Sequence, residues 1–276
     1  MDQNWIVENL NNAFTTWNEK LTELWSLVTT SPATFKGGAV WGIMQTIHGA
    51  MLAIGYALVI LFFAMSLFKN TANFHELKRP EAALHYLIRF VAAKTAVGYG
   101  MEIMLKVFEV CNGIVSEMAA SMGGISQAMV SLPGEVQTAI ENVGFLASIP
   151  LWLVTILGSL FITVLSFIMI LTVYGRFFRL YMYTALAPIP LATFAGDSTQ
   201  SVGVSFLKTY VGVCMEGAVI VLACIIYAGF VGTPVVASGE ATTMVWSYLA
   251  ETVFNMLVLV GLIKGSDRIV HEMMGL

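Results

Sequence analysis

Charged residues are scarce in this sequence. Asp, Glu, Lys and Arg make up 11% of its 276 residues, whereas soluble domains average about 25%. Hydrophobic residues reach 58%, and the mean hydropathy is +0.81. This shortage of charge excludes a soluble globular domain and indicates a membrane protein. The net charge of −4 argues against a nucleic-acid-binding surface taken as a whole.

The sequence also lacks the motifs of catalysis and metal binding. It contains no H-E-x-x-H, no phosphate-binding loop, and four histidines without the spacing of metal ligands. Its three cysteines, Cys111, Cys214 and Cys224, are odd in number, and the last two lie in an apolar run. We therefore expect them to act as small hydrophobic residues rather than to form a disulfide. We expect no enzymatic activity, no cofactor and no metal.

Long apolar runs dominate what is present. The run LWLVTILGSLFITVLSFIMILTVY, residues 151–174, has 24 residues without a charge. About 20 such residues suffice to cross a membrane as a helix, so this run predicts a span. The sequence as a whole predicts an all-α polytopic membrane protein with five spans. They cover about residues 40–68, 84–107, 151–174, 206–231 and 244–263.

Pro188 and Pro190 interrupt the apolar run that follows residues 151–174. Each proline removes a backbone donor and disrupts the preceding helical turn. We predict a re-entrant segment over about residues 181–195, dipping into the membrane from the cytoplasmic side. Irregular backbone at that depth must be buried in protein or line a water-filled space. A kinked sixth span is the alternative.

The distribution of basic residues predicts the orientation. Lys and Arg are absent from residues 110–148 and 233–243, so these loops should lie outside. The N-terminus would then be outside and the C-terminus inside. Arg176 and Arg179 would be cytoplasmic basic residues that anchor the topology, or that contact DNA phosphate or an ATPase.

Residues 1–38 are predicted to be an extracytoplasmic amphipathic helix and linker, and residues 39–276 a membrane bundle with an outer loop at 110–148. The first 30 residues lack the continuous apolar core of a signal peptide. Instead, apolar residues such as Leu10, Trp17 and Leu21 recur at helical spacing. This helix either lies on the membrane or a partner, or packs on its own bundle.

Four charged residues fall inside predicted spans: Lys94, Glu102, Glu216 and Glu251. A lone charge in the hydrocarbon layer is costly, so these residues should pair or face the protein interior. Lys94 and Glu216 each lie ten residues into a span from the same side, which places both at a depth of about 15 Å. The spacing predicts an ion pair between them, with Glu251 as the rival partner for Lys94.

The chain also resembles a known family. The run SIPLWLVTILGSLFITVLSFIMILTVYGRFFRLYMYTALAPIPLATFAG, residues 148–196, is similar to the core of the TrbL-like conjugal-transfer proteins. Residues 9–42, 78–94 and 254–276 resemble that family too. Its members are polytopic membrane subunits of type IV secretion systems, here in the form carried by Gram-positive conjugative elements.

The resemblance implies a channel or platform subunit in the cytoplasmic membrane that helps a DNA–protein substrate cross. Its partners would be membrane lipid, the secretion-system ATPases, other membrane subunits, and single-stranded DNA in transit. It implies no enzymatic activity. A small chain that forms a conduit should assemble into a closed homo-oligomeric ring, and the resemblance favours a pentamer. An ion- or proton-coupled transporter and a purely structural scaffold are the alternatives.

Overall fold

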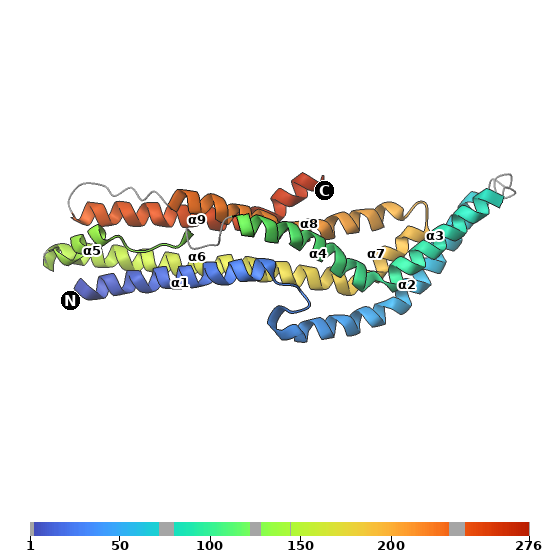
Figure 1. The fold of residues 1–276 in the computed structure, drawn as a ribbon, viewed down its shortest axis with the longest axis horizontal. Coiled ribbons are helices and arrows are strands. Elements are labelled where there is room, and N and C mark those ends of the chain that lie inside the picture. Colours follow the sequence, from blue (N-terminus) through green and yellow to red (C-terminus); the bar gives the residue numbers. More distant parts are fainter. Residues whose placement is uncertain (1–2, 72–79, 122–127, 144, 232–240, 276) are drawn as a thin grey trace. The chain divides into compact units, whose positions relative to one another are not determined.

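The computed structural model describes residues 3–71, 80–121, 128–143, 145–231 and 241–275. All regular elements in these ranges are helical, which confirms the all-α class. Their order along the chain is shown in Figure 1. The elements are α1 (Gln3–Thr29), η1 (Phe35–Gly38), α2 (Ala39–Thr71), α3 (Pro80–Gly98), α4 (Gly100–Ser121), α5 (Gly134–Glu141), α6 (Phe145–Leu186), α7 (Pro188–Ala192), η3 (Thr193–Ala195), α8 (Gln200–Val231) and α9 (Ala241–Met274).

Several of these helices are long and apolar enough to cross a membrane. Among the described residues there are four such stretches, and they include four of the five predicted spans. The fifth predicted span, residues 84–107, is instead divided between α3 and α4 near Tyr99, and it is not one of the four. The protein is a polytopic membrane protein, and the number of spans stays a prediction. The four stretches are Phe35–Lys69, Ile149–Leu186, Gln200–Val231 and Thr242–Met274.

The backbone contacts divide the chain into two compact units. The first unit consists of Met1–Thr29, Val115–Gly175 and Gly217–Ser266. The second consists of Thr30–Ile114, Arg176–Glu216 and Asp267–Leu276. The predicted division into domains at residue 38 stays a prediction.

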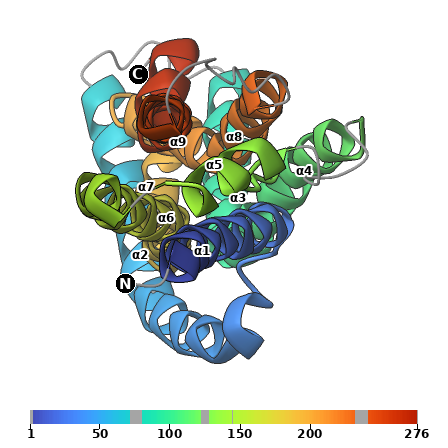
Figure 2. The same cartoon turned by 90° about the vertical axis from the view of Figure 1, so that its left-hand side faces the viewer.

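In the first unit, α1 packs on the chain itself. It lies alongside the first part of α6 in both Figure 1 and Figure 2. Trp17 is fully buried at 0% exposure, and the side chain of Asn9 donates to Ser159 Oγ of α6 at 2.9 Å. Burial of the apolar face confirms the amphipathic pattern, and it selects packing on the bundle over an exposed helix.

The charged residues of α1 extend this contact. Glu23 accepts a hydrogen bond from the Tyr174 hydroxyl of α6 at 3.3 Å. Its other carboxylate oxygen lies 2.7 Å from Lys20 Nζ, and this hydrogen bond raises the pKa of Lys20 above its ordinary value. The Glu23 carboxylate therefore contacts both Lys20, one turn earlier in α1, and Tyr174 of α6.

In the second unit, the short elements α7 and η3 pack against α2 and α3. The core between them consists of small and branched side chains, including Val59 of α2, Val97 of α3, and Leu191 and Ala192 of α7. Tyr210 of α8 is buried beside them, and its hydroxyl donates to the carbonyl oxygen of Met104 at 2.9 Å. This core fixes the segment that follows α6.

Candidate functional site

The proline-broken segment begins later than the sequence predicted. Helix α6 continues past Tyr174 to Leu186, because no proline interrupts the chain between Tyr174 and Pro188. The regular helix therefore ends just before Pro188, and residues 181–186 belong to α6 rather than to a re-entrant segment. The non-regular part is residues 187–199, which contains only the short elements α7 and η3.

Pro188 leaves a carbonyl without its usual partner, and a histidine supplies one. In a regular helix the N–H of residue 188 would bond the carbonyl of Thr184, but proline has no N–H. His48 of α2 takes its place, with Nδ1 lying 2.9 Å from the Thr184 oxygen. A carbonyl oxygen only accepts hydrogen bonds, so this contact requires the hydrogen on Nδ1. His48 is 4% exposed, so the exchange of partners occurs in the protein interior.

Arg89 of α3 holds the other end of the segment. Its Nε donates to the carbonyl oxygen of Phe194 at 3.0 Å, and its Nη2 donates to Gln200 Oε1 at 2.6 Å. Its Nη1 forms an ion pair with Asp197. Ser66 of α2 donates to the same carboxylate at 2.9 Å. Side chains of α2 and α3 therefore satisfy polar groups at both ends of the break.

Glycines allow the segment to lie directly against its neighbours. A Cβ atom added at Gly55 of α2 would lie 2.9 Å from the Pro188 Cβ and 3.0 Å from the Pro188 oxygen. A Cβ added at Gly203 of α8 would lie 2.8 Å from Thr193 Oγ1. Most of the segment from Ala187 to Gly196 is thus buried in protein, whereas Ile189, Asp197 and Ser198 are exposed. Its approach from the cytoplasmic side stays a prediction.

Arg176 is buried rather than exposed at a membrane interface. Its side chain is 1% exposed, and it donates from Nε to the carbonyl oxygen of Val213 at 3.2 Å and from Nη2 to that of Cys214 at 3.0 Å. Its guanidinium also lies 5.8 Å from the centre of the Phe108 ring. These contacts join α6 to α8 and α4. The guanidinium therefore has no surface from which to contact DNA phosphate or an ATPase.

Arg179, and not the predicted Lys94, forms the ion pair with Glu216. Its Nη2 lies 2.6 Å from Glu216 Oε2, and its Nη1 lies 2.7 Å from Asp267 Oδ1. Glu216 is 2% exposed, whereas the side chain of Lys94 is exposed. The predicted pair of Lys94 and Glu216 is wrong. Matched depth does not make two residues face each other, and a depth counted from a helix end fails where helices extend beyond the hydrocarbon layer.

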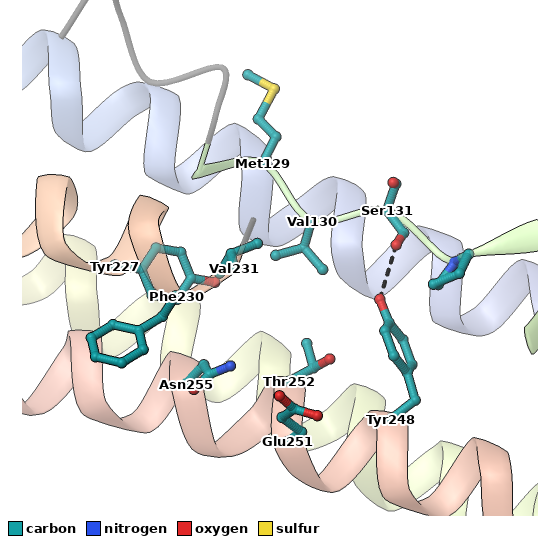
Figure 3. A pocket seen from close by; sticks show the side chains of 11 residues that line it. Met129, Val130, Ser131, Tyr227, Phe230, Val231, Tyr248, Glu251, Thr252 and Asn255 are labelled. Atoms are coloured by element: carbon teal, nitrogen blue, oxygen red, sulfur yellow. Dashed lines mark hydrogen bonds between the residues drawn. The ribbon is translucent and has the colours of Figure 1, made fainter. Parts of the chain in front are cut away.

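The two remaining charged residues of the predicted spans lie in different surroundings. Glu102 is exposed on α4 of the second unit. Glu251 is partly buried on α9 of the first unit, where it lines a cavity of about 270 Å³ (Figure 3). Glu102 and Glu251 therefore belong to different units. Within the described residues no group of three or more His, Cys, Asp and Glu side chains could hold a metal ion.

Comparison with known protein families gives one match. A family model described as TrbL/VirB6 plasmid conjugal transfer like protein matches residues 17–188, which is more than half of the chain. The chain belongs to this family. No curated protein and no solved structure matches it.

This TrbL/VirB6-like chain is thereby a membrane protein of conjugal transfer that works with other parts of the conjugation machinery. The match begins at Trp17 in α1 and ends at Pro188, the first residue of α7. It contains His48, Arg89 and Arg176, whereas Glu216 and Glu251 lie beyond it.

Sequence reasoning missed His48 and Asp197 as parts of the site. A signal for His48 was present, because it is the one side chain in the predicted span 40–68 that can carry a positive or negative charge near neutral pH. Its partner is created by a proline 140 residues later in the chain, so nothing near His48 in the sequence indicates it. Asp197 follows the apolar run directly, where a loop carboxylate is ordinary.

Proposed function

We propose that this TrbL/VirB6-like protein is a channel or platform subunit of a conjugative type IV secretion system in the cytoplasmic membrane. It helps a DNA–protein substrate to cross, has no enzymatic activity, and works beside the secretion ATPases. The observation that carries the proposal is the family match over residues 17–188 in a polytopic helical chain. The N-terminus lies outside and the C-terminus inside, in accord with the distribution of basic residues.

The exposed face of α3 and α4 supports assembly with further subunits. Lys94, Glu102 and Lys106 are exposed there, and Tyr99 and Val110 are exposed beside them. Charges on a membrane helix are costly against lipid and are found facing protein or water. This face is therefore covered by neighbouring subunits or borders an aqueous path. We call these five residues the α3–α4 face.

The arrangement that we propose is a homo-oligomeric ring with the α3–α4 face at its contacts or its lumen. Repeated heterologous contacts either close into a ring or continue as a filament, and a membrane conduit requires closure. The resemblance to TrbL-like proteins favours five copies. Single-stranded DNA in transit is the ligand of the lumen, and membrane lipid surrounds the ring.

Two alternatives are weaker. A coupled transporter was suggested by Lys94, Glu216 and Glu251, but Glu216 is paired with Arg179 and Lys94 is exposed, so Lys94 and Glu216 do not act as a pair. A structural scaffold would differ from a channel in one respect: the transferred DNA would contact the channel subunit but not the scaffold.

Site-specific photocrosslinking during transfer tests the proposal. A photoreactive residue replaces Lys94 or Glu102, and the matched control replaces Leu171, an apolar residue of α6 that is also exposed. A channel predicts crosslinks from the α3–α4 face to transferred DNA and none from Leu171. Crosslinks from that face to other copies alone identify a platform. Normal transfer by cells that lack the protein would refute both.

A further inference from the structure

The cavity at Glu251 is a separate feature of the first unit. It has a volume of about 270 Å³ and lies between α8, α9 and residues 129–133. Figure 3 shows Glu251, Thr252 and Asn255 of α9 on one side of this space, with Tyr227 of α8 and Val130 across from them. None of these groups takes part in the contacts of the proline-broken segment.

Two polar side chains that line the cavity, Glu251 and Tyr227, differ from the others in their contacts. Glu251 is the one charged residue among the described residues that line it, and within the described chain it forms no ion pair. The hydroxyl of Tyr227 is buried, with the residue 3% exposed, and it has no hydrogen-bond partner among the described residues. Tyr248 is different, because its hydroxyl donates to the carbonyl oxygen of Ser131 at 2.9 Å. A carboxylate and a buried phenol thus line the same space.

Aromatic rings complete the wall. Tyr227, Phe230 and Tyr248 all line the cavity. The face of an aromatic ring carries negative charge density and attracts cations, most strongly where water is excluded. Together with one carboxylate, these rings make an environment that favours a single positive charge on a group with apolar substituents.

The composition of the lining discriminates between kinds of ligand. An anion would be repelled by Glu251. Ca²⁺ and Mg²⁺ take six or more oxygen ligands, usually including carboxylates, and Zn²⁺ is held mainly by His and Cys side chains, whereas the described lining offers one carboxylate and neither His nor Cys. The volume also exceeds that of a bare ion. An organic ammonium group pairs with the carboxylate and lies against the rings, and a primary ammonium can also donate a hydrogen bond to the hydroxyl.

We propose that this cavity binds a small organic ammonium group, with Glu251 as its counter-ion and Tyr227 and Phe230 as its aromatic wall. The group is either a free amine or the amine of a lipid headgroup. The proposal does not depend on a role in DNA transfer.

Calorimetric titration of the purified full-length protein in mild detergent provides the first test. Choline and ethanolamine are the probes, and sodium and potassium chloride are the inorganic controls. Glu251→Gln should weaken binding of both probes more than tenfold. Glu117→Gln, which removes an exposed glutamate of the same unit, should leave it unchanged. Unchanged affinity in Glu251→Gln, or no binding of either probe to the wild type, would overturn the proposal.

A second variant keeps the test decisive if Glu251→Gln does not fold. Phe230→Leu removes one ring from an exposed position and should weaken choline binding about 2- to 30-fold, the range of a cation–π contact. An unchanged affinity for choline in Phe230→Leu would show that the Phe230 ring does not contact the ammonium group, and would refute the aromatic part of the proposal.

Native mass spectrometry distinguishes the two sources of the amine. Protein from nanodiscs of mixed phosphatidylethanolamine and phosphatidylglycerol should retain the ethanolamine lipid, and Glu251→Gln should not, if a headgroup is the ligand. Equal retention by both variants, together with calorimetric binding of the free probes, identifies a free amine. Displacement of the probes by equimolar sodium or potassium would show a simple cation site and refute the proposal.

Discussion

Replacement of His48 by Phe should expose how the break at Pro188 is stabilised. The variant removes the Nδ1 donor that lies 2.9 Å from the Thr184 oxygen, and it keeps a flat ring of similar size. His48→Asn serves as the matched control, because its side-chain amide places an N–H close to the position of Nδ1. Pro188→Ala provides the second half of a mutant cycle, because it restores the backbone N–H that a helix would direct at Thr184.

The magnitude follows from burial. His48 is 4% exposed and Thr184 is 1% exposed, so the carbonyl would be left in the interior without this donor. An unsatisfied buried acceptor costs about 1–3 kcal/mol, and His48→Phe should lower the free energy of unfolding by about that amount. In the Pro188→Ala background the new N–H takes over the carbonyl. The cost of His48→Phe should then fall by about 1–2 kcal/mol, a coupling typical of residues with a shared partner.

Unfolding of the purified protein by SDS in mixed micelles, followed by circular dichroism, measures these free energies. His48→Asn should retain more stability than His48→Phe. Equal costs of His48→Phe in the wild-type and Pro188→Ala backgrounds would show that the histidine does not replace the missing backbone donor.

Three further predictions concern other contacts. Arg179→Met should lower the free energy of unfolding by about 3–5 kcal/mol in the same SDS assay, because it leaves Glu216 buried and unpaired. Adding Glu216→Gln should recover part of this loss, and a double variant no more stable than Arg179→Met would contradict the prediction. Gly55→Leu should prevent the packing of α7 on α2, and protease digestion of membranes should then cleave this region faster than in Gly49→Leu, where the space is open. Asn18→Ala should speed hydrogen exchange at the Val130 amide, which donates to Asn18 Oδ1 at 2.9 Å; exchange at the wild-type rate would show that this bond is not protective.

The helical class and the presence of a break at the prolines were readable from the sequence for physical reasons, whereas the predicted start of the break at residue 181 was too early. A charge-poor run must satisfy its own backbone in a membrane, so it predicts a helix. Pro188 cannot continue the hydrogen-bond ladder, and α6 ends just before it. The amphipathic pattern of residues 3–29 likewise corresponds to a buried face, because its apolar residues pack within the first unit, Phe14 against Tyr248 and Trp17 against Tyr227.

The partners of the charged residues were harder to predict, because hydropathy depends on composition and does not show which way a side chain points. Arg176 and Arg179 seemed to mark the end of a span, yet α6 has 42 residues and is about 63 Å long, about twice the thickness of the hydrocarbon layer. Arg176 is accommodated by carbonyl oxygens of α8, which no side-chain pattern reports. Glu216 could have faced any of several helices, and its depth alone did not select Arg179.

The side-chain donors at the break have a consequence for biogenesis. His48 and Arg89 precede the carbonyls that they bind, at Thr184 and Phe194, by 136 and 105 residues. A ribosome therefore releases the donors well before it makes the acceptors, and chains fold from the N-terminus during synthesis. Helices α2 and α3 can therefore already be in the membrane when residues 187–196 are synthesised. The carbonyl groups at the break can then bond to His48 and Arg89 at once, without a period in which they are exposed to lipid and unpaired.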